Sequence, residues 1–171
     1  MKKNLHNSKG FTIVETLVAI AILMISIAGP LTIAQKGLMA SVYARDQSVA
    51  TFLAQDAMEY AKNYRDNQIK SNPSDWLGIL ANCGLGSGGS DCTVDTTDEG
   101  SITAGGSPIL YRTDYGYNHD SSGAKSQFSR TLSVSETDED YQVRVVVEVE
   151  WTTGTIHNVV TLENYFFNVT I

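Results

Sequence analysis

The chain is poor in basic residues and in histidine, and each shortage argues against a class of function. Its 171 residues hold 12 Lys and Arg against 19 Asp and Glu, giving a net charge of -7. An acidic surface repels nucleic-acid phosphate, and no basic stripe with interleaved aromatics is present, so nucleic-acid binding is not expected. Only 3 His are present, and no nucleophile–base arrangement stands out. We therefore expect neither an enzyme nor a bound cofactor or metal.

Charge is also missing from a long apolar run, which is the most informative part of the sequence. From Phe11 to Ala34 the only charged residue is Glu15. As a helix this run spans about 36 Å, enough to cross a bilayer. A lone ionisable group inside a membrane segment is costly there, and it is therefore a functional hypothesis.

The leader before this run is basic. Lys2, Lys3 and Lys9 precede the run, whereas the flank after it is mixed, with Arg45 beside Asp46. The positive-inside rule therefore places the N-terminus in the cytoplasm and the chain after about residue 36 outside. Without the leader, 9 basic residues face 19 acidic ones, a net charge of -10.

The apolar run continues into a one-sided helical pattern. Spacings near three, four and seven predict an amphipathic helix, carried by Leu38, Val42, Val49, Phe52, Leu53, Tyr60 and Tyr64. One long helix is expected over about 11–69, ending before Asn72-Pro73 because the residue before proline disfavours the helical region.

Gly29 and Pro30 interrupt this helix. Proline costs about 3 kcal/mol in a helix interior and glycine about 1, so a kink or a locally melted turn is expected. Two explanations remain open. Membrane helices tolerate such residues, and the pair can equally serve as a hinge.

Cys83 and Cys92 are the only cysteines. They fit an oxidising compartment and predict one disulfide, with two unpaired thiols as the alternative. Closing so short a loop stabilises the fold by about 2–3 kcal/mol in the chain-entropy model.

Residues 82–108 are rich in Gly, Ser, Thr and Asp and predict a loop with room for a short strand. The glycine-rich stretch 84–89 lacks the Lys-Ser/Thr of a phosphate cradle. Four acidic residues offer oxygen ligands to calcium, but their spacing fits no ordered calcium loop, so a solvated loop is favoured; they are Asp91, Asp95, Asp98 and Glu99.

The C-terminal part predicts β-structure. Apolar and polar residues alternate most clearly in Tyr141–Thr152, and a turn at Thr153-Gly154 leads into a further strand. The expected strands are Ile109–Thr113, Gln127–Glu136, Tyr141–Thr152 and Thr155–Phe167. An antiparallel meander of three or four strands needs a cover for its apolar face, and the helix of residues 38–68 supplies one. The fold class is α+β.

At the leader junction the chain resembles a known family. Gly10-Phe11-Thr12-Ile13-Val14-Glu15, followed by a long apolar helix, resembles the processing signature of type IV pilins and type II secretion pseudopilins. The runs Glu15–Leu23, Val147–Trp151 and His157–Leu162 are similar to V-type minor pilins and I-type minor pseudopilins.

The resemblance implies roles by position. A prepilin peptidase would cut between Gly10 and Phe11 and N-methylate the new amine of Phe11, and Glu15 would pair with that amine of a neighbouring subunit. The implied partners are the peptidase, other pilin or pseudopilin subunits, the inner-membrane assembly platform and, before assembly, membrane lipid. The location would be the cytoplasmic membrane, and then the pilus surface or periplasm.

The same resemblance divides the chain into four parts. These are a cleaved leader 1–10, a membrane and filament-core helix 11–36, the amphipathic half of the helix 37–70, and an extracytoplasmic β domain 71–171. The expected function is a minor pilin-like subunit; the main alternative is a minor pseudopilin of a type II secretion or DNA-uptake system.

Two further alternatives are weaker. A signal-anchored enzyme or binding module would draw on His157 or on the polar cluster Asp114, Asn118, His119 and Asp120, which is more typical of a turn than of a metal site. An ordinary signal peptide would be cut near Thr32–Ala34, but the apolar run is too long for one and Glu15 interrupts it.

Overall fold

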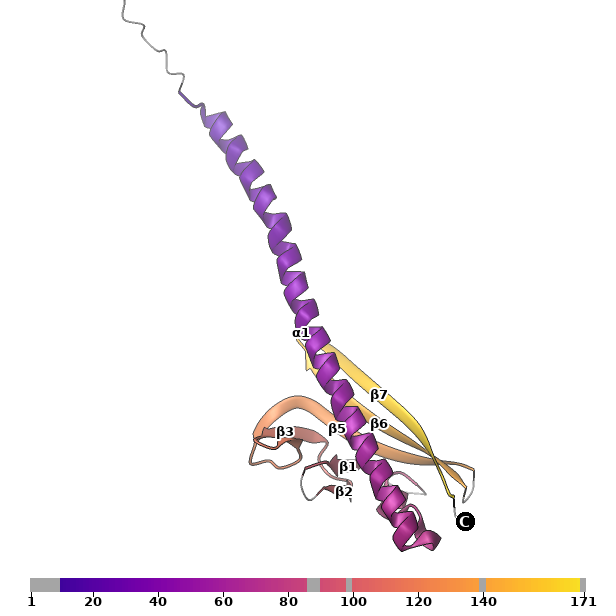
Figure 1. The fold of residues 1–171 in the computed structure, drawn as a ribbon. Helices are drawn as coiled ribbons and strands as arrows, with labels where there is room; N and C mark the ends of the chain where they lie inside the picture. The colour runs from indigo at the N-terminus through magenta and orange to yellow at the C-terminus, as the bar shows by residue number, and fades with distance from the viewer. Residues whose placement is uncertain (1–9, 86–89, 98–99, 139–140, 170–171) are drawn as a thin grey trace, which may run out of the picture. The chain divides into compact units, whose positions relative to one another are not determined.

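The computed structural model describes residues 10–85, 90–97, 100–138 and 141–169 (Figure 1). The chain divides into two compact units, Met1–Ala44 and Arg45–Ile171. The first holds the N-terminal part of helix α1, and the second holds the rest of α1 and the whole β-sheet.

Helix α1 runs from Ile13 to Ser71, close to the helix predicted over 11–69. It includes Gly29 and Pro30 without a break. The locally melted turn is therefore not seen, and a kink or hinge at this pair stays a prediction. The helix ends where expected: the N–H of Asn72 donates to the carbonyl oxygen of Gln68 at 2.7 Å, and proline follows.

Two short 3-10 helices and seven strands follow α1. Their bounds are η1 Pro73–Asp75, η2 Gly78–Asn82, β1 Cys92–Asp95, β2 Ser101–Ala104, β3 Ile109–Thr113, β4 Gly116–Asn118, β5 Ala124–Asp138, β6 Gln142–Thr153 and β7 Ile156–Phe167. In the part of the chain that the structure describes, the seven strands form one antiparallel sheet. The prediction of three or four strands is therefore too low.

The long strand β5 organises the sheet. One edge of β5 pairs with β6, and its other edge pairs first with β3 and then with β1. The strands β5, β6 and β7 form the predicted meander. Gly154 has a φ of 64°, a left-handed conformation suited to the tight turn between β6 and β7.

The segment predicted as a loop with one short strand contains a hairpin instead. β1 and β2 pair over four residues each, from Cys92 opposite Ala104 to Asp95 opposite Ser101. Strand β4, which was not predicted, pairs with β3 across a tight turn, with Thr113 opposite Gly116. Strands this short show too few alternations to register as a pattern.

In the second unit α1 packs against the sheet through small side chains. Its buried positions are Asp46, Ala50, Leu53, Ala54, Ala57, Met58 and Ala61. Four of these are alanines, which form one stripe of small buried side chains on this face of the helix. Part of the predicted apolar face is wrong, because Phe52 is 70% exposed. Leu38, in the first unit, is also exposed within the chain.

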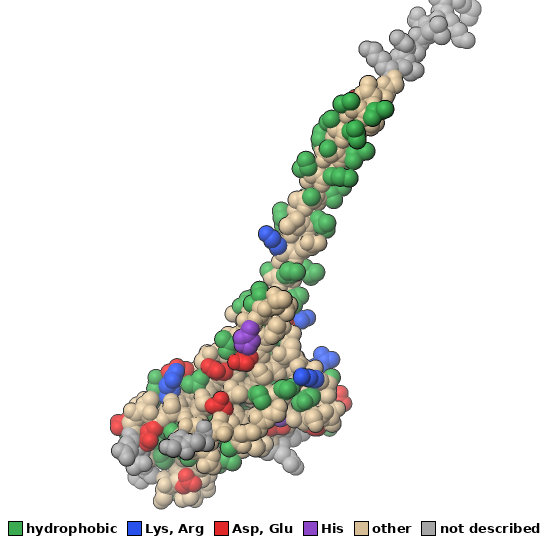
Figure 2. Space-filling model, turned by 180° about the vertical axis from the view of Figure 1, so that it is seen from behind, with side chains coloured by type: hydrophobic (Ala, Val, Ile, Leu, Met, Phe, Trp, Pro, Cys, Tyr) green, Lys and Arg blue, Asp and Glu red, His purple; other side chains and the backbone are tan. Residues whose placement is uncertain are grey.

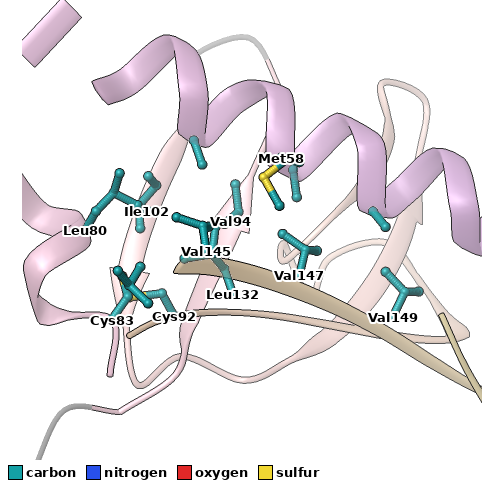
Figure 3. Packing of buried hydrophobic residues seen from close by; sticks show 14 of the residues in the cluster. Met58, Leu80, Cys83, Cys92, Val94, Ile102, Leu132, Val145, Val147 and Val149 are labelled. Atoms are coloured by element: carbon teal, nitrogen blue, oxygen red, sulfur yellow. A yellow bond between two sulfur atoms is a disulfide. The ribbon is translucent and has the colours of Figure 1, made fainter. Parts of the chain in front are cut away.

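The core lies between this stripe and the inward residues of the strands (Figure 3). Met58 of α1 faces a cluster from β1, β5 and β6 that includes Val94, Leu132, Val145 and Val147. The apolar residues predicted to lie on one face of β6 thus do face the helix. The long helix packed against an antiparallel sheet gives the α+β, pilin-like layout expected from the sequence.

Candidate functional site

The leader junction precedes the helix. Gly10 and Phe11 are not helical, since α1 begins at Ile13, and Phe11 is 78% exposed. A Cβ added to Gly10 would meet no atom within 4 Å. The Gly10–Phe11 bond therefore lies in accessible, irregular backbone; Lys2, Lys3 and Lys9 lie outside the described residues.

Thr12 caps the helix, a role that the sequence analysis missed. The backbone N–H of Glu15 donates to the hydroxyl oxygen of Thr12 at 3.3 Å. This satisfies one of the free N–H groups at the start of α1. The spacing Thr-x-x-Glu is that of a capping box and was the available signal. The cap fixes the start of the helix at Ile13, two residues after Phe11, and places Glu15 in its first turn.

Glu15 lies in the first turn of α1 and is exposed. Within the described part of the chain it has no ion-pair partner. The helix dipole stabilises a carboxylate in this turn. The stabilising free energy is only a fraction of the free energy that burying the charge in lipid costs. A counter-charge for Glu15 thus has to come from outside the described chain if this segment is buried.

The other polar side chains of the apolar segment bond to the helix itself. The hydroxyls of Thr16, Ser26 and Thr32 donate to backbone carbonyls three or four residues earlier, at 2.8, 2.8 and 2.9 Å. Such bonds let hydroxyls sit in lipid without unsatisfied donors. By length and composition α1 can cross a membrane, and Figure 2 shows apolar side chains along its N-terminal part.

These features meet in one segment at the head of an apolar helix: a junction in open backbone, a capped helix start, and a carboxylate that has no ion-pair partner among the described residues. Residues 5–29 match the prokaryotic N-terminal methylation motif. This motif is the hallmark of type IV pilins and pseudopilins. It implies processing by a prepilin peptidase and assembly with other pilin subunits. No curated protein and no solved structure is detectably similar to this chain.

The pilin-type motif covers Gly10, Phe11 and Glu15 and also reaches Gly29. Together with the apolar helix it indicates a membrane-anchored, single-pass protein. The motif ends well before the β domain. It therefore bears on the processing of the N-terminus and says nothing of the role of the second unit.

The two cysteines form a disulfide in the second unit. Cys83 and Cys92 are bonded, with their Cα atoms 5.1 Å apart. The bond joins the residue after η2 to the first residue of β1, and both side chains are fully buried. It thus links η2 to β1 within the core, a structural role.

A buried arginine is the main feature of this unit that sequence reasoning missed. Arg130 of β5 is fully buried and donates to the carbonyl oxygens of Leu53 at 3.0 Å and of Val94. Its guanidinium lies 3.7 Å from the carboxylate of Asp56, which also accepts a bond from Thr96. Arg130 therefore connects α1, β1 and β5, and burial lowers its pKa.

The polar cluster near β4 forms turns. Asp120 accepts from the backbone N–H and hydroxyl of Ser122 at 2.9 and 2.7 Å, and these bonds lower the pKa of its carboxyl. The amide nitrogen of Asn118 donates to the hydroxyl of Thr113 at 3.2 Å. Burial lowers the pKa of His119, and the charge of Arg130 acts in the same direction.

No group of three or more His, Cys, Asp or Glu able to hold a metal occurs within the described ranges. Of the four acidic residues weighed for calcium, Asp98 and Glu99 lie outside those ranges, as does most of the stretch 84–89. Asp95 accepts bonds from the backbone N–H and hydroxyl of Thr97 at 3.0 and 2.6 Å. His157 lies exposed on β7, 3.9 Å from Glu150.

Proposed function

We propose that this protein is a minor pilin-like structural subunit of a type IV pilus or a related filament, and not an enzyme. The observation that carries the proposal is the coincidence of Gly10, Phe11 and Glu15 with the methylation motif at the start of an apolar helix. Cleavage after Gly10 removes the basic leader and creates a cationic amine on Phe11.

The new amine supplies a counter-charge for the Glu15 carboxylate. A carboxylate in the membrane costs about 2.5–3.5 kcal/mol on insertion scales. An opposite charge about 4 Å away returns about 4 kcal/mol at an effective dielectric constant of 20. An amine from a neighbouring subunit therefore offsets the cost of Glu15 and fixes the axial register between subunits.

The location of the remaining parts of the chain follows from this mode of assembly. Residues 11–36 lie in lipid before assembly and in the filament core afterwards, with the N-terminus on the cytoplasmic side. The β domain faces outward, in the periplasm or at the cell surface, and presents its loops to other subunits. Delivery to the filament requires the inner-membrane assembly platform. Gly29 and Pro30 give the core helix a hinge.

The assignment to the minor class rests on the similarity of Glu15–Leu23, Val147–Trp151 and His157–Leu162 to V-type minor pilins and I-type minor pseudopilins. The alternative machine is a type II secretion or DNA-uptake pseudopilus, which uses the same N-terminal chemistry. Purification of surface pili and of secretion pseudopili, each probed for this protein, distinguishes the two systems.

The register role is tested by Glu15→Val. Removing the carboxylate leaves the chain stable and inserted in the membrane, but excludes it from filaments. Thr16→Val is the matched control, since it replaces the next residue without changing charge and should assemble normally. The readout is the amount of each variant in purified filaments relative to the membrane fraction. Normal incorporation of Glu15→Val would refute the register role.

A further inference from the structure

Strand β7 leaves one long edge of the sheet open. It pairs with β6 over its whole length, from Gln142 opposite Phe167 to Thr153 opposite Ile156, and the register shows no shift. None of the other described strands pairs with β7, which lies outermost beside β6 in Figure 1. An uncovered edge is a template for a further strand.

The turn determines which residues of β7 face this edge. Thr153 and Ile156 close a two-residue hairpin, so they form a hydrogen-bonded pair and every second residue of β7 bonds to β6. The odd-numbered residues therefore point their N–H and C=O groups away from β6. Two contacts agree with this parity: the N–H of Tyr165 donates to the Asn164 side chain at 2.8 Å, and Arg65 donates to the oxygen of Phe167 at 3.2 Å.

Those two contacts satisfy part of one end of the edge and leave its middle open. Within the described structure, the outward main-chain groups of His157, Val159, Thr161 and Glu163 have no hydrogen-bond partner. Natural edges are blunted by lysine, proline, bulges or short length. β7 is 12 residues long and contains no lysine, proline or bulge.

The two faces beside the edge differ in chemistry. On the helix side Val160 and Leu162 are only half-buried, although they pack against the core. On the opposite face Val159 is 51% exposed, and Glu148 and Glu150 of β6 lie opposite Thr161 and Val159. This face also carries Arg144, which pairs with Glu163 at 2.7 Å, and its three carboxylates therefore outnumber its one arginine. An added strand thus meets apolar surface on one face and a net negative charge on the other.

This pattern argues against a second copy of the same strand. β7 has no lysine or arginine, and it carries Glu163. Because Glu163 is paired with Arg144, a copy would bring the net negative charge of the same face, from Glu148 and Glu150, towards an identical face, in a chain whose net charge after the leader is already -10. A strand with basic residues on that face complements it instead.

We propose that the open edge of β7, His157–Glu163, binds an extended segment of a partner protein in which apolar and basic residues alternate. The main-chain hydrogen bonds provide the affinity and the alternating side chains provide the specificity, as in other cases of strand addition. The proposal concerns the β domain alone and holds whether or not the protein joins a filament.

The probe is a short peptide of alternating valine and lysine, with a peptide of alternating valine and glutamate as its matched control. Both are titrated against the full chain in a neutral detergent. The lysine peptide should bind at least about tenfold more tightly and should slow amide hydrogen exchange at Val159 and Thr161. Equal binding of the two peptides, or no protection at these amides, would overturn the proposal.

The edge is tested directly by Val159→Pro, with Val159→Thr as control. Because the N–H of Val159 points away from β6, proline removes an edge donor without removing a ladder bond within the sheet. Val159→Pro should lower peptide affinity by about tenfold or more, and Val159→Thr should not. Hydrogen exchange across β6 reports whether Val159→Pro stays folded.

Binding by a folded Val159→Pro at the parent's affinity would contradict the proposal. If Val159→Pro disrupts β6, Thr161→Pro provides the same test two residues along, where the N–H also faces outward. The parent chain could instead form a concentration-dependent dimer that either proline variant abolishes. That result would assign the edge to a second copy of the chain and would contradict the proposal of a partner segment.

Discussion

The guanidinium of Arg130 donates to the carbonyl oxygen of Leu53 at 3.0 Å, across 77 positions of the sequence. A second donor of the same group reaches Val94 of β1. One side chain of β5 therefore bonds to the backbone of both the helix and a neighbouring strand. Because Arg130 is fully buried, these bonds replace part of the water that its charge would otherwise require, while its Nε has no partner among the described residues.

Replacement of Arg130 should be strongly destabilising. Arg130→Met keeps much of the volume but removes the hydrogen bonds to Leu53 and Val94 and the ion pair with Asp56. We expect a loss of about 3 kcal/mol in the free energy of unfolding, measured by urea denaturation of the full chain in detergent. The control is Arg112→Met on β3, where the side chain is exposed and the change should stay within about 0.5 kcal/mol. Equal effects of the two variants would show that Arg130 has no special role.

The alanine stripe of α1 predicts that larger side chains are rejected there. Ala57 is fully buried in the core, so Ala57→Leu forces the helix and sheet apart and should cost about 1–3 kcal/mol. Gln55→Leu adds similar apolar volume on the exposed side of the same helix and should be nearly neutral. Thermal unfolding of both variants measures the difference, and a stable Ala57→Leu would mean that helix and sheet do not pack closely.

Glu163 should titrate at unusually low pH. The hydrogen bond from Arg144 at 2.7 Å, aided by one from Tyr165, lowers the pKa of the Glu163 carboxyl from 4.5 to about 2. A lowered carboxyl pKa contributes stability that is present above pH 4.5 and is lost as the pH falls through about 2.

Carbon NMR of the side-chain carboxyl measures this pKa. Arg144→Gln should raise the pKa of Glu163 towards its ordinary value, because the charged donor is gone. Arg112→Gln, on β3, removes a positive charge that is not bonded to Glu163 and should leave its pKa unchanged. A Glu163 pKa that Arg144→Gln does not move would mean that the ion pair is absent in solution.

The N-terminal segment and the meander could be predicted from sequence because their signals are local. The apolar run and Glu15 lie within 24 residues, and β6 alternates along most of its length, with Val146 as the exception. The helix face was harder to predict. Phe52 fits an apolar spacing but is exposed, whereas Ala54, Ala57 and Ala61 form the contact. Alanine has little hydrophobicity, so an apolar spacing drawn from large side chains does not reveal that these positions are buried.

Arg130 could not be recognised because its partners are distant in the chain. In a strand pattern a charged residue is ordinarily assigned to the solvent face, and only the fold brings Leu53 and Val94 within reach. The hairpin of β1 and β2 was missed for a related reason. Its first strand is bonded to Cys83 through Cys92 and pairs with Leu132 of β5, and both contacts are made only in the folded chain. Thr12 is a different case, because the Thr-x-x-Glu spacing of its capping box is local and could have been recognised in the sequence.

The central claim is that the leader is removed between Gly10 and Phe11 and that the new amine serves assembly. Intact-mass and N-terminal analysis of the mature protein from membranes tests it most directly. The account predicts a chain that begins with N-methylated Phe11. A mature chain that begins near Gln35, or one that retains Met1 in a host with an active prepilin peptidase, would contradict it.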